Sequence, residues 1–127
     1  MATTFISSKR FDGLSIEEEV AQSENAVILH ISGTVDSHTY DQLEEKFQSL
    51  FSNGMYRIVV DMERVQYISS AGIGVFVGAM SQASTEKGAL ILTGLSTVVR
   101  EVFEVLGIAP MFTITVDKSS ALAAFNP

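Results

Sequence analysis

The stretch RIVVDMERVQYISSAGIGVFVGAM, residues 57–80, joins an apolar strand to an apolar helix through two serines. Residues 57–62 form a short continuous apolar run, which is typical of a strand that is buried on both faces. From Gly72 to about Lys87 the apolar residues follow helical spacing, and Gly88 ends the pattern. The stretch therefore predicts a strand, a loop and a helix, with Ser69 and Ser70 at the start of the helix.

Strands and helices alternate on both sides of this stretch. Further strands are expected at residues 14–20, 25–33, 89–94 and 111–116, and further helices at residues 39–54, 96–107 and 117–125. This order predicts an α/β fold, in which a single domain has a mixed sheet of about five strands and about four helices packed against it. Because residues 1–13 have no clear period, we expect a leader there and the domain at residues 14–127.

The composition limits the classes of function. The chain has 127 residues, the size of one domain, and 46% of them are hydrophobic, which is enough to form a core. The formal net charge of −7 argues against nucleic acid and anionic membranes as partners. The absence of cysteine excludes disulfides and thiolate metal sites. Because we find no signal peptide and no apolar run long enough to span a membrane, we expect a cytoplasmic protein.

The glycines suggest a nucleotide-binding loop and the histidines suggest a metal site, but the spacing and number of these residues support neither. Gly72, Gly74 and Gly78 have the spacing G-x-G-x-x-x-G, one residue longer than the dinucleotide fingerprint, and no Walker lysine follows. Close packing of the helix explains these glycines better. Two histidines without cysteine are a poor set of metal ligands, so we expect no metal, no cofactor and a structural role for His30.

Two carboxylates, Asp36 and Asp61, come at or just after the carboxyl ends of expected strands. Binding sites of open α/β sheets collect at that end. Hydrogen bonding within a turn or loop is the alternative for each residue. A site role is favoured for Asp36, and both interpretations stay open for Asp61.

The helix after the serines has no polar residue between positions 72 and 80. The apolar residues left over from its inward face are Val75, Gly78 and Ala79. A surface helix normally has a polar face, so this helix is either enclosed in the core or presents a second face to a partner protein. A phosphate on the preceding serines would be tolerated at a helix N-terminus but would place charge beside an apolar face. This combination is typical of a switch.

The chain resembles the STAS domain family, which is named for sulfate transporters and anti-sigma-factor antagonists. The family signature is an apolar strand ending in Asp, a loop, a serine, small residues and a helix; it is matched by Asp61, Ser70, Gly72, Ile73 and Gly74. The segment LHISGTVDSHTYDQLEEKF, residues 29–47, resembles the strand–Gly-x-x-Asp–helix unit of the family and places Asp36 on its acidic position. Residues 98–125 are similar to the closing helix, strand and helix of the family.

The resemblance implies a partner-switching protein that is not an enzyme. In the antagonist branch the serine of the signature is phosphorylated; this is Ser70 here, with Ser69 as the alternative because many members have Asp there. The implied partners are a serine kinase of the ATPase fold, often itself the anti-sigma factor, and a metal-dependent serine phosphatase. Only the dephosphorylated form would bind the kinase. The expected partner-binding residues are Asp36, Ser69, Ser70, Ala71, Gly72, Ile73, Gly74, Val75, Gly78 and Ala79.

Two other functions stay open from the sequence. The domain could be a STAS scaffold that is never phosphorylated, or a domain that senses a small ligand or a nucleotide. A small enzyme or nucleotide-binding protein that uses the glycine loop is the alternative from another class.

Overall fold

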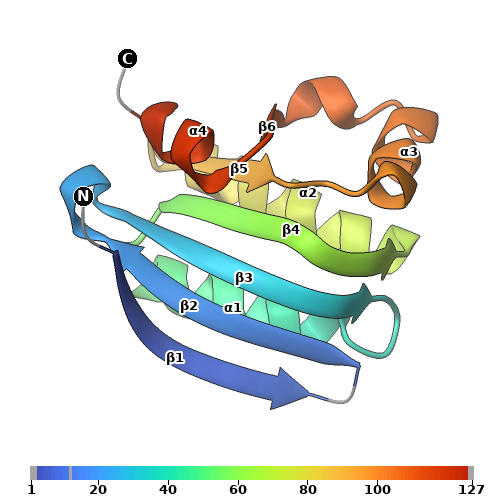
Figure 1. Cartoon of the computed structure of the whole chain (residues 1–127), viewed down its shortest axis with the longest axis horizontal. Coiled ribbons are helices and arrows are strands. Elements are labelled where there is room, and N and C mark those ends of the chain that lie inside the picture. Colours follow the sequence, from blue (N-terminus) through green and yellow to red (C-terminus); the bar gives the residue numbers. More distant parts are fainter. Residues whose placement is uncertain (1–2, 12, 126–127) are drawn as a thin grey trace.

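The strands pair into one six-stranded mixed sheet in the computed structural model, which describes residues 3–11 and 13–125 (Figure 1). The strands are β1 (Thr3–Phe11), β2 (Leu14–Ala21), β3 (Ala26–Val35), β4 (Arg57–Ile68), β5 (Ala89–Thr93) and β6 (Thr113–Thr115). They lie side by side in chain order. β1, β2 and β3 are antiparallel neighbours, whereas β3 to β6 are parallel.

The helices pack on both faces of this sheet. They are α1 (Tyr40–Ser52), α2 (Ser70–Thr85), α3 (Thr97–Val105) and α4 (Lys118–Ala123), with short 3₁₀ turns at Gln22–Glu24 and Ala109–Met111. Figure 1 shows α1 and α2 behind the sheet, α4 in front of it, and α3 beside the carboxyl end of β4. This arrangement confirms the predicted mixed α/β fold. Within the described ranges, no helix combines the length and apolar character needed to cross a bilayer.

Alternation along the central strands separates two apolar clusters. The larger cluster lies between the sheet and the two rear helices, where the rings of Phe47 and Phe76 meet edge to face with centroids 6.1 Å apart. The smaller cluster joins Ile28 and Val59 to Leu122 of α4 on the opposite face. In front of β2 and β3, none of the described helices covers that second face (Figure 1). His30 and Glu19 on this face are partly exposed, with 26% and 15% of their side chains accessible.

The strand that leads to the serines is longer than the sequence predicted. We expected it to end at Met62, but β4 continues to Ile68 and has 12 residues. Its pairing with β3 shifts register twice, between His30 and Ser32 and between Gly33 and Thr34, where β4 has an extra residue. Such bulges break the period of two, so the polar segment after Met62 resembled a loop.

The segment before residue 14 contributes the additional strand. β1 pairs antiparallel with β2, from Thr3 opposite Ala21 to Phe11 opposite Leu14. Among the described residues, the sheet therefore has six strands, one more than the five that the sequence predicted. Residues 1, 2 and 12 of the expected leader lie outside the described residues.

Candidate functional site

Parallel pairing of β3 and β4 places Asp36 and Ser70 at the same end of the sheet. Val35 lies opposite Ile68 at the ends of the two strands. One residue further on, the backbone N–H of Ser69 donates a hydrogen bond to the carbonyl oxygen of Val35, with an N–O distance of 2.9 Å. The predicted placement of Asp36 and Ser70 is thereby confirmed.

The two serines have different positions at the start of α2. Ser69 is the half-buried N-cap residue: its Oγ accepts a hydrogen bond from the Gly72 N–H at 3.4 Å, and its carbonyl accepts one from the Ile73 N–H at 2.9 Å. Ser70 is the first helical residue and is exposed. Among the described residues, none forms a hydrogen bond with the Ser70 hydroxyl. Of the two hydroxyls, that of Ser70 is the accessible one.

Gly72 allows this start of the helix to approach the sheet closely. A Cβ at Gly72 would lie 2.7 Å from the carbonyl oxygen of Val35 and 2.9 Å from Cγ1 of Ile68. A Cβ at Gly74, by contrast, would have no neighbour within 4 Å. The first glycine of the motif therefore has a packing role, as the sequence favoured, and the second is exposed.

The second apolar face predicted for α2 is not exposed. Val75 and Ala79 have only 6% and 4% of their surface accessible, because this face packs against α1. Together with the exposed Gly78, they border a small hollow beside Phe47 and Gln48 of α1. The expectation that Val75 and Ala79 form a free docking surface is wrong. The sequence left open whether this face is enclosed in the core or covered by a partner protein, and the structure shows that α1 of the same chain covers Val75 and Ala79.

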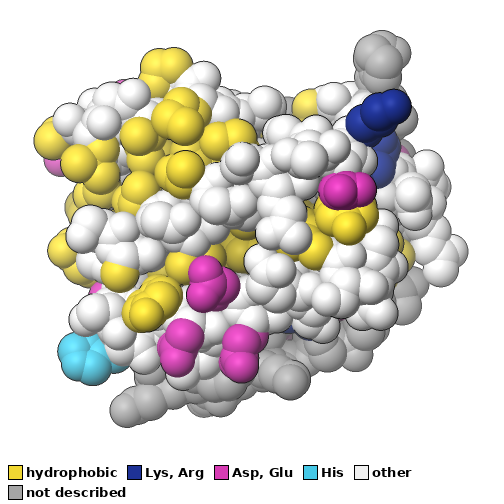
Figure 2. Space-filling model, turned by 180° about the vertical axis from the view of Figure 1, so that it is seen from behind, with side chains coloured by type: hydrophobic (Ala, Val, Ile, Leu, Met, Phe, Trp, Pro, Cys, Tyr) yellow, Lys and Arg dark blue, Asp and Glu magenta, His cyan; other side chains and the backbone are white. Residues whose placement is uncertain are grey.

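An apolar groove lies on the other side of the serines, between the end of β4 and α3. It has a volume of about 410 Å³ and is lined by Tyr67, Ile68, Ser69, Ser70, Val98, Glu101, Val102, Val105 and Leu106. Val105 is 84% exposed, and Tyr67, Val98 and Leu106 are at least half exposed. Figure 2 shows hydrophobic side chains gathered over the end of the molecule that carries α3. Exposed apolar groups at such density are typical of a protein contact.

The carboxylate of Asp36 is engaged in its own turn. Asp36 Oδ1 accepts a hydrogen bond from the His38 N–H at 2.8 Å, and the Asp36 N–H donates one to Thr39 Oγ1 at 3.0 Å. Thr39 Oγ1 in turn donates to the carbonyl oxygen of Thr34 at 2.7 Å. Asp36 therefore fixes the turn between β3 and α1, and any role in partner binding stays a prediction.

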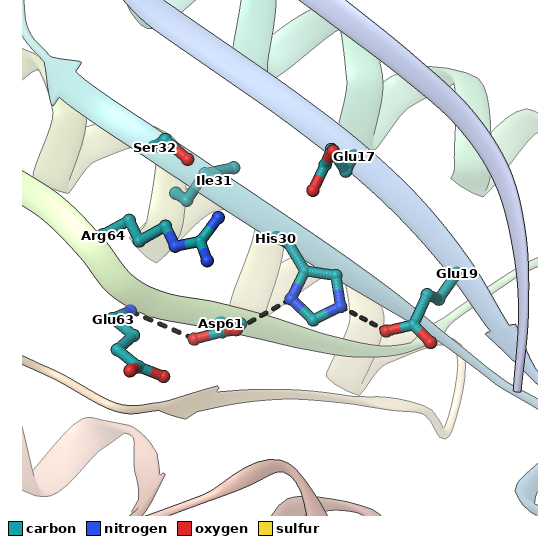
Figure 3. Close-up of a pocket in the computed structure, with 8 residues that line it drawn as sticks. All are labelled: Glu17, Glu19, His30, Ile31, Ser32, Asp61, Glu63 and Arg64. Atoms are coloured by element: carbon teal, nitrogen blue, oxygen red, sulfur yellow. Dashed lines mark hydrogen bonds and ion pairs between the residues drawn. The ribbon is translucent and has the colours of Figure 1, made fainter.

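A cluster of polar side chains lies on the face of the sheet in front of β2 and β3, and the sequence did not predict it. Figure 3 shows His30 of β3 between Asp61 of β4 and Glu19 of β2, each joined to one ring nitrogen. The distance from His30 Nδ1 to Asp61 Oδ2 is 2.7 Å. Lys118 Nζ of α4 lies 3.5 Å from Glu19 Oε1. Asp61 is thus a mid-strand residue of β4, and its expected place at the carboxyl end of a strand is wrong.

Sequence spacing contained a signal for this cluster. Glu17 and Glu19 are two positions apart in one strand and therefore share a face, opposite Leu14 and Ile16. His30 lies between the buried Leu29 and Ile31 in the next strand, so it is also expected on the face that points away from the core. The register between strands, which decides the contacts, is not visible in that pattern. The pocket beside the cluster has a volume of about 360 Å³. In the part of the chain that is described, no three His, Cys, Asp or Glu residues are arranged to hold a metal ion.

Removal of the N-cap is expected to weaken the domain without removing the accessible hydroxyl. Ser69→Ala deletes the acceptor for the Gly72 N–H and should lower the free energy of unfolding by about 1 kcal/mol. Urea denaturation measures the loss, with Ser84→Ala, an exposed position in the same helix, as the matched control. Equal stability of the two variants would contradict a capping role of Ser69.

Comparison with known proteins agrees with this geometry. Residues 18–123 match the STAS domain family. BtrV of Bordetella bronchiseptica, named as an anti-sigma factor antagonist, is 36% identical over 100 residues, which cover 79% of this chain and 86% of that protein. The anti-sigma-B factor antagonist of Bacillus subtilis is 29% identical over 102 residues, covering 80% of this chain and 93% of that protein.

The fold is similar to that of the anti-sigma factor antagonist SpoIIAA. Its unphosphorylated structure is 24% identical, with a TM-score of 0.73, and the match covers 86% of this chain and 94% of that chain. Its phosphorylated structure matches with a TM-score of 0.67 and covers 86% and 97% of the two chains. The chain belongs to the STAS domain family, and its relatives place it among the anti-sigma factor antagonists.

Proposed function

We propose that this chain is a phosphorylation-controlled binding protein. Unmodified, it binds an anti-sigma factor that is also a serine kinase of the ATPase fold, and phosphorylation of Ser70 releases this partner. The observation that carries the proposal is the exposed Ser70 hydroxyl at the N-terminus of α2, on the border of an apolar groove. The similarity to antagonists supports the choice of partner, and SpoIIAA occurs in phosphorylated and unphosphorylated structures.

A phosphoryl group on Ser70 is compatible with the fold. It adds about −1.5 to −2 charges at neutral pH. At the N-terminus of a helix, such charge is stabilised by roughly 0.3–1 kcal/mol through the helix dipole. Because Ser70 is exposed, the group would extend into solvent and displace no packed atoms. Loss of binding after phosphorylation would therefore come from the surface and not from unfolding.

The same phosphoryl group is unfavourable once a partner covers the groove. Glu101 is the charged residue that lines the groove, and within the described residues no Lys or Arg lines it. The added charge would therefore lie near a carboxylate and beside the apolar side chains of Val98 and Val105, without a cation from this chain. Desolvating an unpaired charge costs several kcal/mol, on the order of a thousandfold in affinity.

Because Val75 and Ala79 are buried, the proposed contact surface uses the side chains of α3 that line the groove in their place. It consists of the Ser70 loop with its exposed or half-exposed neighbours and the apolar groove: Asp36, Tyr67, Ser69, Ser70, Ala71, Gly74, Val98, Val105 and Leu106. Gly72 and Ile73 are buried and shape the loop from below. Gly78 is exposed but borders the hollow beside α1 and does not line the groove, so it is left out of the surface.

The switch needs a second protein to reset it. We propose a metal-dependent serine phosphatase that returns Ser70 to its unmodified form. The chain itself acts by binding and not as an enzyme, and the cycle runs in the cytoplasm, where ATP is available to the kinase. We assign this function to residues 14–127, with β1 added at the edge of their sheet.

Phosphorylation by the kinase is expected at Ser70 alone. The chain is incubated with its anti-sigma kinase and ATP, and the tryptic peptide of residues 65–87 is fragmented by mass spectrometry. We expect one phosphoryl group at Ser70 in the natural chain and in Ser69→Ala, and none in Ser70→Ala. Modification of Ser69 would move the site by one residue. Absence of modification in every variant would favour an unphosphorylated scaffold.

A further inference from the structure

The His30 cluster on the open sheet face has a hydrogen-bond pattern that requires a proton. Each ring nitrogen of His30 faces a carboxylate oxygen, of Asp61 on one side and Glu19 on the other (Figure 3). An ionised carboxylate only accepts hydrogen bonds, and a neutral imidazole has a single N–H to donate. Between two ionised carboxylates, both hydrogen bonds can therefore form together only when the ring is an imidazolium.

The charges around His30 also favour the protonated ring. Glu17 and Glu19 of β2 and Asp61 and Glu63 of β4 line the pocket at His30. The cations that face the cluster are Arg64 of β4, which lines the same pocket, and Lys118 of α4, which pairs with Glu19. The carboxylates thus outnumber the fixed cations around the ring, and a charged His30 reduces the excess.

We propose that His30 is a proton-dependent clamp across β2, β3 and β4, so that the folded domain binds a proton and loosens when this proton leaves. Protonated His30 joins Glu19, Asp61 and, through Glu19, the Lys118 side chain of α4. After deprotonation, one of the two carboxylates loses the hydrogen bond from His30, while its other contacts remain. The strand β4 that carries Asp61 also ends directly at the Ser69–Ser70 loop.

Stability is expected to fall on the alkaline side of neutrality. The hydrogen bond to Asp61, opposed by burial and supported by the hydrogen bond to Glu19, raises the pKa of His30 above its usual 6.5. A histidine with a raised folded-state pKa stabilises fully below the unfolded value of 6.5. This stabilisation is lost as the pH rises through the folded-state pKa.

At acidic pH, the stability that the clamp provides is limited separately by the titration of Asp61. Burial acts to raise the pKa of this carboxyl, but the hydrogen bonds from His30 and from the Glu63 N–H outweigh it and lower the pKa below 3.8. This contribution is present above 3.8 and is lost as the pH falls through the folded-state value. The clamp therefore stabilises the fold most at pH values between the titration of Asp61 and that of His30.

The test follows the ring and the stability of the full chain. NMR titration of the His30 ring is expected to give a pKa above 6.5, and Asp61→Asn is expected to lower it. In urea, the midpoint of the natural chain should drop as the pH rises through the measured pKa. His30→Gln should lack this alkaline drop. His38→Gln, at a ring that is 90% exposed, should retain it.

Either of two results would contradict the proposed clamp. A His30 ring that titrates at or below 6.5 in the natural chain would do so, even if His30→Gln fails to fold. An alkaline drop of equal size in His30→Gln and in the natural chain would do so as well, because another group would then carry the pH dependence. Neither readout involves the kinase, so both are independent of the proposed switch.

Discussion

Ser70→Asp is expected to weaken binding of the anti-sigma kinase by at least tenfold, whereas Ser70→Ala should bind as the unmodified chain does and resist release. The carboxylate of Ser70→Asp would lie in the contact with the apolar groove and near Glu101. A cost of about 1.4 kcal/mol already gives a tenfold loss, and a desolvated unpaired charge costs more than that. Titration calorimetry against the kinase measures both affinities.

Two controls separate this effect from a loss of fold. A thermal melt of each variant should show that Ser70→Asp is as stable as the natural chain, because acidic residues suit the first turn of a helix. Ser69→Asp keeps a good N-cap and lies half-buried at the cap, so it should reduce binding less. Equal affinities of folded Ser70→Ala and Ser70→Asp would contradict the proposed mechanism.

Gly72→Ala is expected to destabilise the domain, while the same change at Gly74 is expected to stabilise it. The new methyl group at Gly72 would lie 2.7 Å from the carbonyl oxygen of Val35, which is backbone and cannot rotate away. Overpacking of this kind costs about 1–3 kcal/mol. At Gly74 the methyl group has open space, and alanine is favoured over glycine in a helix by up to about 1 kcal/mol.

The pair is a matched comparison, since both glycines lie in the first turns of α2 and receive the same side chain. Urea denaturation followed by circular dichroism gives the two free energies of unfolding. If Gly72→Ala proved as stable as Gly74→Ala, the close approach of α2 to β3 would not limit the packing at the Ser70 loop.

Local sequence patterns were sufficient to predict the architecture of this domain. The apolar runs at residues 57–62 and 89–94 gave the buried parallel strands, and the helix stops at Gly54 and Gly88 separated them from the helices that precede them. The parallel order of β3 and β4 then placed Asp36 and Ser70 at one end of the sheet. These features depend on residues close together in the chain, which is why they could be predicted.

Features that depend on packing between distant segments could not be predicted in the same way. The sequence shows that α2 is apolar on two faces, but it does not show that α1 covers Val75 and Ala79. The bulges of β4 have no local signature, so the strand was expected to end too early. The contact of His30 with Asp61 joins residues 31 positions apart and is set by strand register.

The central claim is that phosphate on Ser70 controls partner binding. The most direct measurement compares the natural chain before and after phosphorylation, with calorimetric titration of the kinase into each form and mass spectrometry to verify complete modification of Ser70. We predict that the phosphorylated form stays folded and binds at least tenfold more weakly, a difference of about 1.4 kcal/mol or more. Equal affinity of the two folded forms would contradict the account.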